Sequence, residues 1–522
     1  MPVIKRRKAK KTGQILRINL KEDPSCLDPR RGRNMSSDSQ VQAMLFEGLM
    51  RFESDGSLTC AQASHYELSS DRTTYTFHLK STFWSDGTPV TAHDFEYTWK
   101  NILTPTFPSL DPHALFCIKN AQGAKEGIIP LSEVGIRALD DKTLVVELER
   151  PTLYFLHIAA SSVLFPINAF QDQLFPDWHL EATPHFIGNG PFTLNTWEHN
   201  REIILEKNLH YRLADQIKLD QIQIHMINSG IARLHMHASG LFDIVGLPLS
   251  NLPHDLYREM LQQNLLHVIQ TPGTMGCMFN TKQEPFNNVH IRKAFAYSIN
   301  RKQIVDRITY TKEKPAFGII PPQFKEHSTP QLFKDNDIVT AQRLLEIGLK
   351  ELNLTARDLQ GKLTFSFWKH DHCCPELPQF LHDEWKEKLN VNVELEALNF
   401  KTLHQKGREG NFSMGYFVPA SIYFDPIEIL ERFKYSNNPR NYPRWENAQY
   451  IKLINQSEQT ASVKERLSLL NLAEEILMEQ MPFAPIFHWN YALLVQPHVK
   501  GFCVSPLGYL NFDRISIKTT FH

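Results

Sequence analysis

Two different periods of apolar residues alternate along this chain, and this alternation limits its possible folds more than any other feature. Leu16, Ile18 and Leu20 are separated by polar residues, as in a half-buried strand. Val463 and Leu467 belong to a long segment in which apolar residues recur at helical spacing. Segments of both kinds interleave and no repeat of fixed period is present, so we predict an α/β fold of the mixed α+β type.

The length of the chain indicates more than one structural unit. At 522 residues it exceeds the ~250–300 residues at which a single hydrophobic core usually stops growing. No apolar run approaches the ~20 residues needed to cross a bilayer, so we expect a soluble chain. The net charge of −1, from 56 basic and 57 acidic residues, exerts no general attraction on nucleic acid or anionic membranes. We therefore expect no nucleic-acid partner.

The N-terminal segment is strongly basic, with six Lys and Arg residues between Lys5 and Lys11. The apolar stretch of a secretory signal does not follow, because Thr12 and Gly13 lead directly towards the first strand. We expect a solvated basic tail over residues 1–13 with no visible export signal, and a truncated or misassigned signal region is the alternative. The seven cysteines are odd in number, so at least one should stay unpaired within the chain.

A run of residues at 83–95 (FWSDGTPVTAHDF) has the pattern of a tight turn and a capped helix, and it follows an alternating strand pattern at 75–79. Gly87 and Pro89 suit the turn, and Thr91 followed by Asp94 suits the helix start. With 46–49 (FEGL) and 75–80 (YTFHLK), this run resembles the extracytoplasmic solute-binding family that serves oligopeptide, dipeptide and nickel importers. Further matches follow in the same order at 188–192, 239–243, 289–301 and 482–486. The resemblance therefore covers nearly the whole chain from about residue 14.

The resemblance implies a two-lobed, periplasmic-binding-protein-like fold with a hinge and an extra inserted domain in the first lobe. The implied boundaries are 14–47, 182–271 and 489–522 for lobe I, 48–181 for the inserted domain and 272–488 for lobe II. The Gly/Pro clusters at 188–191 and 272–273 are the expected crossings between lobes.

The same resemblance implies a function. A ligand would lie in the cleft between the lobes, and the protein would deliver it to the membrane subunits of an ABC permease. It also implies a monomer without cofactors, in a periplasmic or cell-surface location and membrane-associated.

The expected ligand pocket departs from the family pattern. Peptide-binding relatives hold the ligand's amino terminus with an aspartate just before a Tyr-x-x-Pro turn, near an arginine and a tryptophan. Here Tyr423 and Pro426 keep the turn, but Ile422 replaces the aspartate, Pro419 the tryptophan and Tyr416 the arginine. The predicted ligand-binding residues are Tyr416, Pro419, Ala420, Ile422, Tyr423, Asp425 and His372.

The loss of the aspartate changes the expected mode of recognition. An ammonium group buried without a carboxylate partner is unfavourable. We therefore predict that the ligand is held by its backbone, so that an N-acetylated peptide binds nearly as well as a free one. Asp425 or Glu428 could replace the missing acid. A non-peptide ligand such as a metal chelate is the alternative.

A metal site is a second possibility in this part of the chain. His370, His372 and Cys373 could supply two or three ligands to one transition-metal ion. Adjacent residues rarely all point at one centre, so a polar loop with one buried thiol is the competing interpretation. The pair His235 and His237 is a weaker candidate, because residues two apart on a helix face different sides.

Two other functional classes fit the sequence less well. We find no G-x-S-x-G, H-E-x-x-H, P-loop or G-x-G-x-x-G motif, so we predict that the chain is not an enzyme. A transcriptional regulator would need a helix-turn-helix domain ahead of the binding fold, and only about 13 residues precede the first predicted strand.

Overall fold

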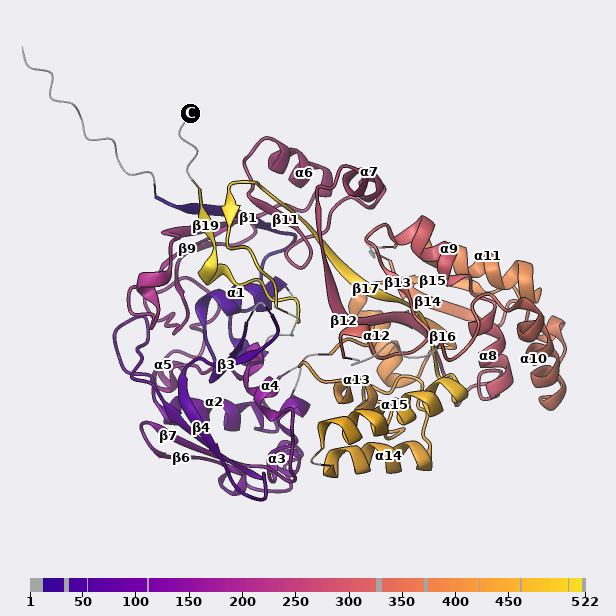
Figure 1. Cartoon of the computed structure of the whole chain (residues 1–522), viewed down its shortest axis with the longest axis horizontal. Helices are drawn as coiled ribbons and strands as arrows, with labels where there is room; N and C mark the ends of the chain where they lie inside the picture. The colour runs from indigo at the N-terminus through magenta and orange to yellow at the C-terminus, as the bar shows by residue number, and fades with distance from the viewer. Residues whose placement is uncertain are drawn as a thin grey trace, which may run out of the picture.

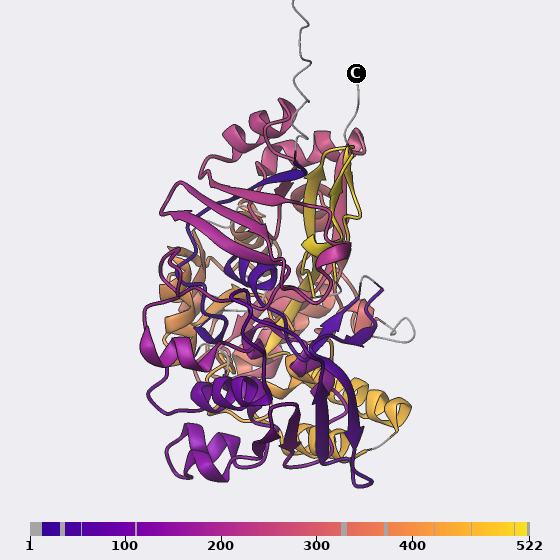
Figure 2. The ribbon, with the colours of Figure 1, turned by 90° about the vertical axis from the view of Figure 1, so that its left-hand side faces the viewer.

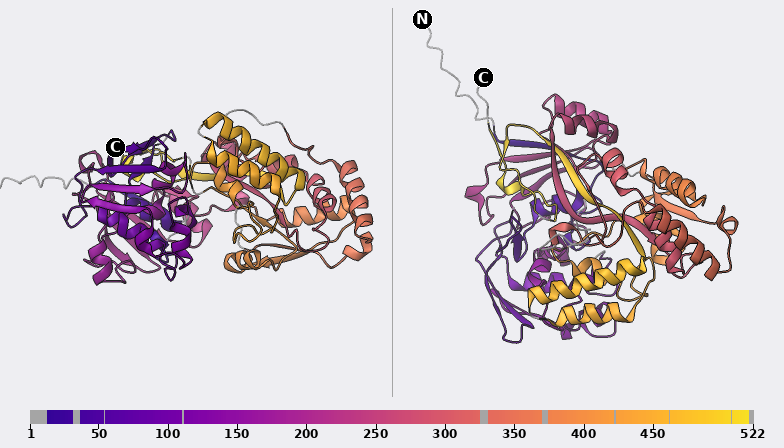
Figure 3. Two further views of the ribbon diagram at one scale, coloured as in Figure 1. Left: turned by 90° about the horizontal axis from the view of Figure 1, so that it is seen from below. Right: turned by 45° about the vertical axis from the view of Figure 1, so that its right-hand side comes forward.

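Two long strands, β12 (Leu266–Phe279) and β17 (Phe483–Val495), run antiparallel through the centre of the molecule (Figure 1). The computed structural model describes residues 13–31, 37–53, 55–109, 112–324, 331–369, 374–421, 423–460, 462–505 and 507–518. The central sheet has the strand order β15-β14-β16-β12-β17-β11-β1-β10-β9-β8, with β13 paired to β17. The β12–β17 pair therefore joins a group of strands in one lobe to a group in the other, and the two lobes stand side by side in Figure 3.

The ladder between β12 and β17 is irregular at its middle. Leu266 pairs with Leu494 at the lobe I end, and the register shifts between Gln270 and Thr274. The predicted crossing at 272–273 lies in this irregular stretch. The cluster at 188–191 instead leads into β8 of lobe I, where the Gly190 N–H donates to the Leu45 carbonyl at 2.9 Å. The domain boundaries derived from the resemblance remain a proposal.

Lobe I is built on the strands beyond β17. The strands are β1 (Ile15–Leu20), β8 (Phe192–Glu198), β9 (Glu202–Lys207), β10 (Gln221–Met226) and β11 (Ile244–Gly246). The helices are α1 (Ser37–Leu45), α6 (Gly230–Ala238) and α7 (Tyr257–Gln262), and a small sheet pairs β18 (Val499–Lys500) with β19 (Ser516–Ile517). The alternation predicted for the first strand is confirmed, because Leu16, Ile18 and Leu20 are all fully buried in β1.

The inserted region stands in front of lobe II in Figure 2 and carries its own antiparallel sheet of order β4-β5-β7-β6. The strands of this sheet are β4 (Ala63–Leu68), β5 (Thr74–Leu79), β6 (Ile136–Asp140) and β7 (Thr143–Glu147). A separate two-stranded sheet pairs β2 (Met50–Phe52) with β3 (Leu58–Cys60). Its helices are α2 (Ala92–Ile102), α3 (Ala121–Lys125), α4 (Phe155–Ala159) and α5 (Ala169–Leu174).

The sequence motif at 83–95 has the structure predicted for it. Gly87 has a φ of +85°, a conformation that suits glycine in a tight turn. Thr91 and Asp94 form a capping box at the start of α2, in which the Thr91 N–H donates to the Asp94 carboxylate at 2.9 Å. Trp84 is 1% exposed. These residues therefore stabilise the inserted region and mark the fold.

Lobe II lies on the β16 side of the central pair. Its strands are β13 (Lys314–Pro315), β14 (Thr364–Trp368), β15 (Glu394–Leu398) and β16 (Met414–Phe417). Its helices are α8 (Val289–Tyr297), α9 (Arg301–Ile304), α10 (Ile338–Glu351), α11 (Leu377–Leu389), α12 (Phe400–Glu409), α13 (Ile427–Glu431), α14 (Ala448–Gln459) and α15 (Val463–Gln480). The long helix predicted from Val463 is α15. Within the described ranges, no helix is long and apolar enough to cross a membrane.

Candidate functional site

A cavity of about 850 Å³ lies between the inserted region and lobe II. Its volume is within the range of roughly 300–1,000 Å³ that is typical of ligand pockets. His113 and Arg150 line it from the inserted region, and Glu431, Lys434 and Arg440 line it from lobe II. A ligand in this cavity would contact both lobes at once.

A pair of stacked tyrosines joins the two walls of the cavity. Tyr154 and Tyr423 have ring centroids 5.1 Å apart and an interplanar angle of 1°. Both side chains are buried, and burial raises the pKa of both phenols well above the ordinary value, so they are neutral at physiological pH. The Arg466 guanidinium lies 5.3 Å from the Tyr154 ring centroid, and Arg150 forms an ion pair with Glu458 of α14. The described structure therefore has its lobes in contact.

The predicted pocket residues lie at different depths. Tyr423 lines the cavity. Tyr416 lies on β16 opposite Cys277, and its ring centroid is 6.2 Å from that of Phe365 in the core of lobe II. Ile422, His370, His372 and Cys373 lie outside the described residues.

Pro419 and Ala420 contact the irregular stretch of β12. The Pro419 carbonyl accepts a hydrogen bond from the Thr274 N–H at 3.2 Å, and Ala420 forms an isolated β-bridge with Gly273. Neither residue is among those that line the described cavity wall. They connect the Tyr-x-x-Pro turn to the irregular middle of the β12–β17 ladder.

The two acids considered as replacements for the missing aspartate already have partners. Asp425 accepts hydrogen bonds from Arg466 at 2.8 and 2.7 Å and from the Ile427 N–H at 2.9 Å. Glu428 is fully buried and forms ion pairs with Arg432 at 3.1 Å and Arg440 at 2.5 Å. Their pairing gives both carboxylates a structural role within lobe II.

Glu431, at the end of α13, is the acid that sequence reasoning missed. Its partly buried side chain lines the cavity and makes no hydrogen bond or ion pair with any residue in the described part of the chain. Burial raises the pKa of its carboxyl, and the charges of Glu458 and Glu428 act in the same direction, against the charges of Arg440 and Lys434. Nothing in the sequence pattern distinguishes Glu431 from its paired neighbours.

The other polar groups of the cavity include cations, a neutral histidine and the exposed carboxylate of Glu126. Lys434 lies 3.1 Å from Glu458, whereas the exposed Arg408 has no ion-pair partner among the described residues. Burial, together with the charges of Arg440 and Arg432, lowers the pKa of His113 well below its ordinary value. His113 is therefore neutral at physiological pH.

The predicted metal site lies outside the described residues, and a different group of metal-binding side chains lies within them. His65, Glu67 and His78 place one ligand atom each within 4.8 Å of one another on the inserted sheet. His235 and His237 lie on α6, the helix predicted for them. The thiols of Cys26, Cys60, Cys117, Cys277 and Cys503 are free, which confirms that unpaired cysteines are present.

Similarity to known proteins extends over the entire fold. Residues 58–441 match the family model of bacterial extracellular solute-binding proteins, family 5 Middle. The oligopeptide-binding protein OppA of Bacillus subtilis (strain 168) is 35% identical over 515 residues, which cover 98% of this chain and 94% of that protein.

Two structures of the murein tripeptide binding protein MppA share the fold of this chain. The Escherichia coli MppA structure matches with a TM-score of 0.83 at 27% identity, covering 97% of this chain and 99% of that one. The unliganded open form of MppA, also 27% identical, matches with a TM-score of 0.77 and covers 97% and 98%. The unliganded open form is thus the weaker match of the two. From the family match and this shared fold, the chain belongs to the bacterial extracellular solute-binding proteins of family 5.

Proposed function

We propose that this chain captures oligopeptides or peptide-like ligands in the interlobe cavity and delivers them to the membrane subunits of an ABC importer. The observation that carries the proposal is the cavity of about 850 Å³ with walls from both lobes. A ligand that contacts both walls is bound more tightly when the lobes are together, so it shifts the population towards the closed form. The closed form would be the shape that the permease recognises.

Several observations support a peptide over a metal chelate. The Bacillus subtilis relative is named for oligopeptides and MppA for a murein tripeptide. The cavity offers both a carboxylate and cationic side chains, which suit the charged ends of a peptide. We further propose that the chain binds without catalysis, acts as a monomer on the extracellular side of the membrane, and associates with the membrane through its permease.

Native mass spectrometry of the purified protein tests the proposal directly. We expect peptides to be retained in the cavity and released on denaturation. Small-angle scattering should then show a smaller radius of gyration when a saturating peptide is added to stripped protein. A stripped protein that binds no peptide, or binds it without any change in radius, would contradict the proposal.

A further inference from the structure

We propose that Glu431 binds the protonated amino terminus of the peptide ligand, in place of the aspartate that is absent at position 422. The inference rests on the proposed function and names the group that would make the ionic contact. It replaces the expectation, drawn from the sequence alone, that no ionic contact is made with the ligand amine.

Position is the first argument for Glu431. It is the last residue of α13, the short helix that begins directly after the Tyr-x-x-Pro turn. Tyr423 of the same turn lines the same cavity and stacks on Tyr154 from the opposite wall. An amino terminus bound at Glu431 would therefore lie beside the contact that joins the lobes, where ligand binding and closure are coupled most directly.

The lack of a protein partner is the second argument. The three neighbouring acids each form ion pairs within the protein. Asp425 pairs with Arg466, Glu428 with Arg432 and Arg440, and Glu458 with Arg150 and Lys434. Glu431 forms no ion pair with the described residues, and burial accordingly raises the pKa of its carboxyl. A partly buried carboxylate without a partner is unfavourable, and an ammonium from the ligand would satisfy it.

A purely structural role for Glu431 is the competing explanation. Five cations share three acids in this cluster, so Glu431 could act as a counter-charge at longer range. Two observations favour the ligand. The raised pKa of Glu431 shows that its surroundings disfavour the charged form overall. The exposed Arg408 also lines the cavity, and the remaining positive charge suits the carboxylate of the same peptide.

The test uses two libraries of tri- to pentapeptides, identical except that one is N-acetylated. Native mass spectrometry and calorimetry would compare stripped wild-type protein with Glu431→Gln, which keeps the size of the side chain and removes its charge. Glu126→Gln is the matched control, because Glu126 lines the same cavity but is exposed and accepts a hydrogen bond from Gln122 at 2.8 Å.

We expect wild-type protein to bind free peptides at least thirtyfold more tightly than acetylated ones. Glu431→Gln should reduce this ratio to below fivefold by weakening free peptides alone, and Glu126→Gln should preserve it. Retention of the ratio in Glu431→Gln, or its absence in wild type while both libraries bind, would overturn the role of Glu431 and leave peptide binding intact. Failure of both libraries to bind would overturn the proposed function and the inference with it.

A second inference comes from the outer face of the inserted sheet. We infer that His65, Glu67 and His78 bind a divalent transition-metal ion of the zinc type. His65 pairs with His78 across β4 and β5, and Glu67 is two residues along β4, so all three side chains project from one face. The imidazole rings stack with centroids 4.4 Å apart, and Glu67 Oε1 lies 3.3 Å from His78 Nε2.

The surroundings of the two imidazoles leave one ring nitrogen of each available to a metal ion. Ser64 donates its hydroxyl proton to the His78 carbonyl at 2.8 Å, so its oxygen accepts from His65 Nδ1 at 3.0 Å. His65 Nε2 is then unprotonated and presents its lone pair, because a hydrogen bond to the other ring nitrogen fixes the tautomer, as it does for metal-binding histidines. His78 Nε2 is buried without a hydrogen-bond partner in the described structure. Two imidazoles and one carboxylate leave a fourth position for water on zinc.

Zinc titration by calorimetry distinguishes this site from the cluster predicted in the sequence. We expect His65→Asn and His78→Asn each to weaken zinc binding at least tenfold, while the double variant His372→Ala with Cys373→Ala leaves it unchanged. The melting temperature of each variant without zinc controls for folding. Zinc binding that survives both histidine substitutions, or that disappears in the double variant, would overturn the assignment, as would the absence of saturable binding to wild-type protein.

Discussion

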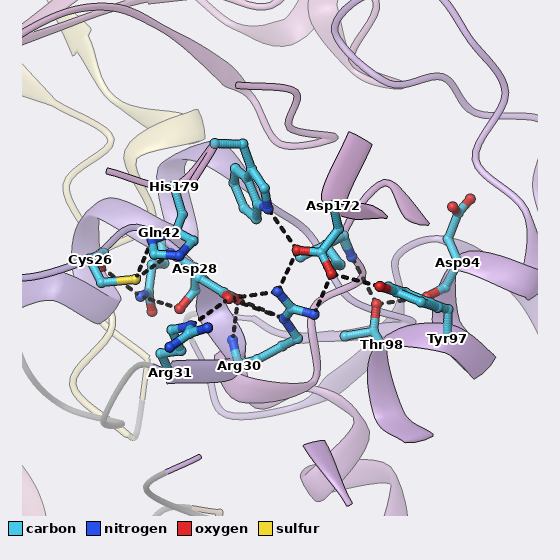
Figure 4. A network of polar contacts seen from close by, with 12 residues as sticks. Cys26, Asp28, Arg30, Arg31, Gln42, Asp94, Tyr97, Thr98, Asp172 and His179 are labelled. Carbon is cyan, nitrogen blue, oxygen red and sulfur yellow. Dashed lines mark hydrogen bonds and ion pairs between the residues drawn. The ribbon is translucent and has the colours of Figure 1, made fainter. Parts of the chain in front are cut away.

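Two buried clusters of charge in this protein differ in how completely they are paired. In the cluster shown in Figure 4, Arg30 is 2% exposed and forms ion pairs with Asp28 at 2.8 Å and Asp172 at 2.7 Å. Asp172 also accepts hydrogen bonds from Tyr97 at 2.7 Å and from the Trp178 ring at 2.9 Å. This network ties the N-terminal part of lobe I to the inserted region.

The second cluster, called the cavity cluster here, contains Asp425, Glu428, Glu431 and Glu458 with their cations, and it is less completely paired. Burial opposes ionisation of Asp172, but the hydrogen bond and charge of Arg30 outweigh it and lower the Asp172 pKa. Glu431 has no such contact, and burial raises its pKa. A paired cluster stabilises the fold, whereas an unpaired group in a cavity reduces stability and is available to a ligand. Whether a charged group has an ion-pair partner therefore distinguishes a structural site from a binding site more clearly than its charge or its burial does.

Breaking the paired cluster should have the largest effect. Asp172→Ala leaves the buried Arg30 with Asp28 alone and removes the acceptor for Tyr97 and Trp178. We expect the free energy of unfolding to fall by about 3–5 kcal/mol in urea denaturation at neutral pH. Asp172→Asn should lose less, because it keeps an acceptor. A loss below about 1 kcal/mol for Asp172→Ala would show that the network is not stabilising.

The same cluster should respond to pH in a defined direction. Asp172 has a lower pKa in the folded than in the unfolded protein, so its contribution is fully present above the unfolded value, near 3.9. That contribution should disappear as the pH falls through the folded pKa. Urea denaturation between pH 6 and pH 2 should show a smaller acid-induced loss of stability in Asp172→Asn than in wild type. Equal acid sensitivity would contradict the assignment.

Disrupting the contact between the cavity walls should weaken ligand binding. Tyr154→Leu removes the ring that stacks on Tyr423, and such aromatic pairs contribute about 0.5–1.5 kcal/mol beyond their buried area. We expect peptide affinity to fall by about three- to tenfold in calorimetry. Tyr154→Phe keeps the ring and serves as the control. Unchanged affinity in Tyr154→Leu would mean that the stack does not form part of the liganded state.

Removing the charge of Glu431, the unpaired acid of the cavity cluster, should raise the stability of the protein. We expect Glu431→Gln to increase the free energy of unfolding of the ligand-free protein by on the order of 1 kcal/mol at pH 7, because it removes a partly buried charge without a partner. Since the folded pKa of Glu431 lies above the unfolded value, the gain should shrink as the pH falls through the folded pKa. Lower stability at pH 7 would instead support the counter-charge explanation.

The smallest effect should come from a paired but partly exposed charge. Lys100 lies 2.7 Å from Glu96, one turn away on α2, and the two side chains are 20% and 23% exposed. Such a helix pair contributes roughly 0.3–0.5 kcal/mol, so Lys100→Met should change the melting temperature only slightly. A loss comparable to that of Asp172→Ala would show that pairing, and not burial, determines the energetics of these clusters.

Local features of the fold could be predicted from the sequence, because they depend on residues close together in the chain. The alternation at Leu16 to Leu20 predicted β1, the helical spacing after Val463 predicted α15, and Thr91 with Asp94 predicted the cap of α2. The resemblance to the family added the two-lobed arrangement. Neither source indicated that β12 and β17 would extend through both lobes as one irregular ladder.

The site was predicted only in part. The sequence by itself determined the Tyr-x-x-Pro turn, the loss of an acid at position 422, and the presence of three other acids within seven residues, Asp425, Glu428 and Glu431. The tertiary structure decided which acid remains available. Asp425 is neutralised by Arg466, 41 residues away, and Glu428 in part by Arg440, 12 residues away. Ion pairs form between segments that folding brings together, so chain position alone cannot identify the carboxylate without a partner.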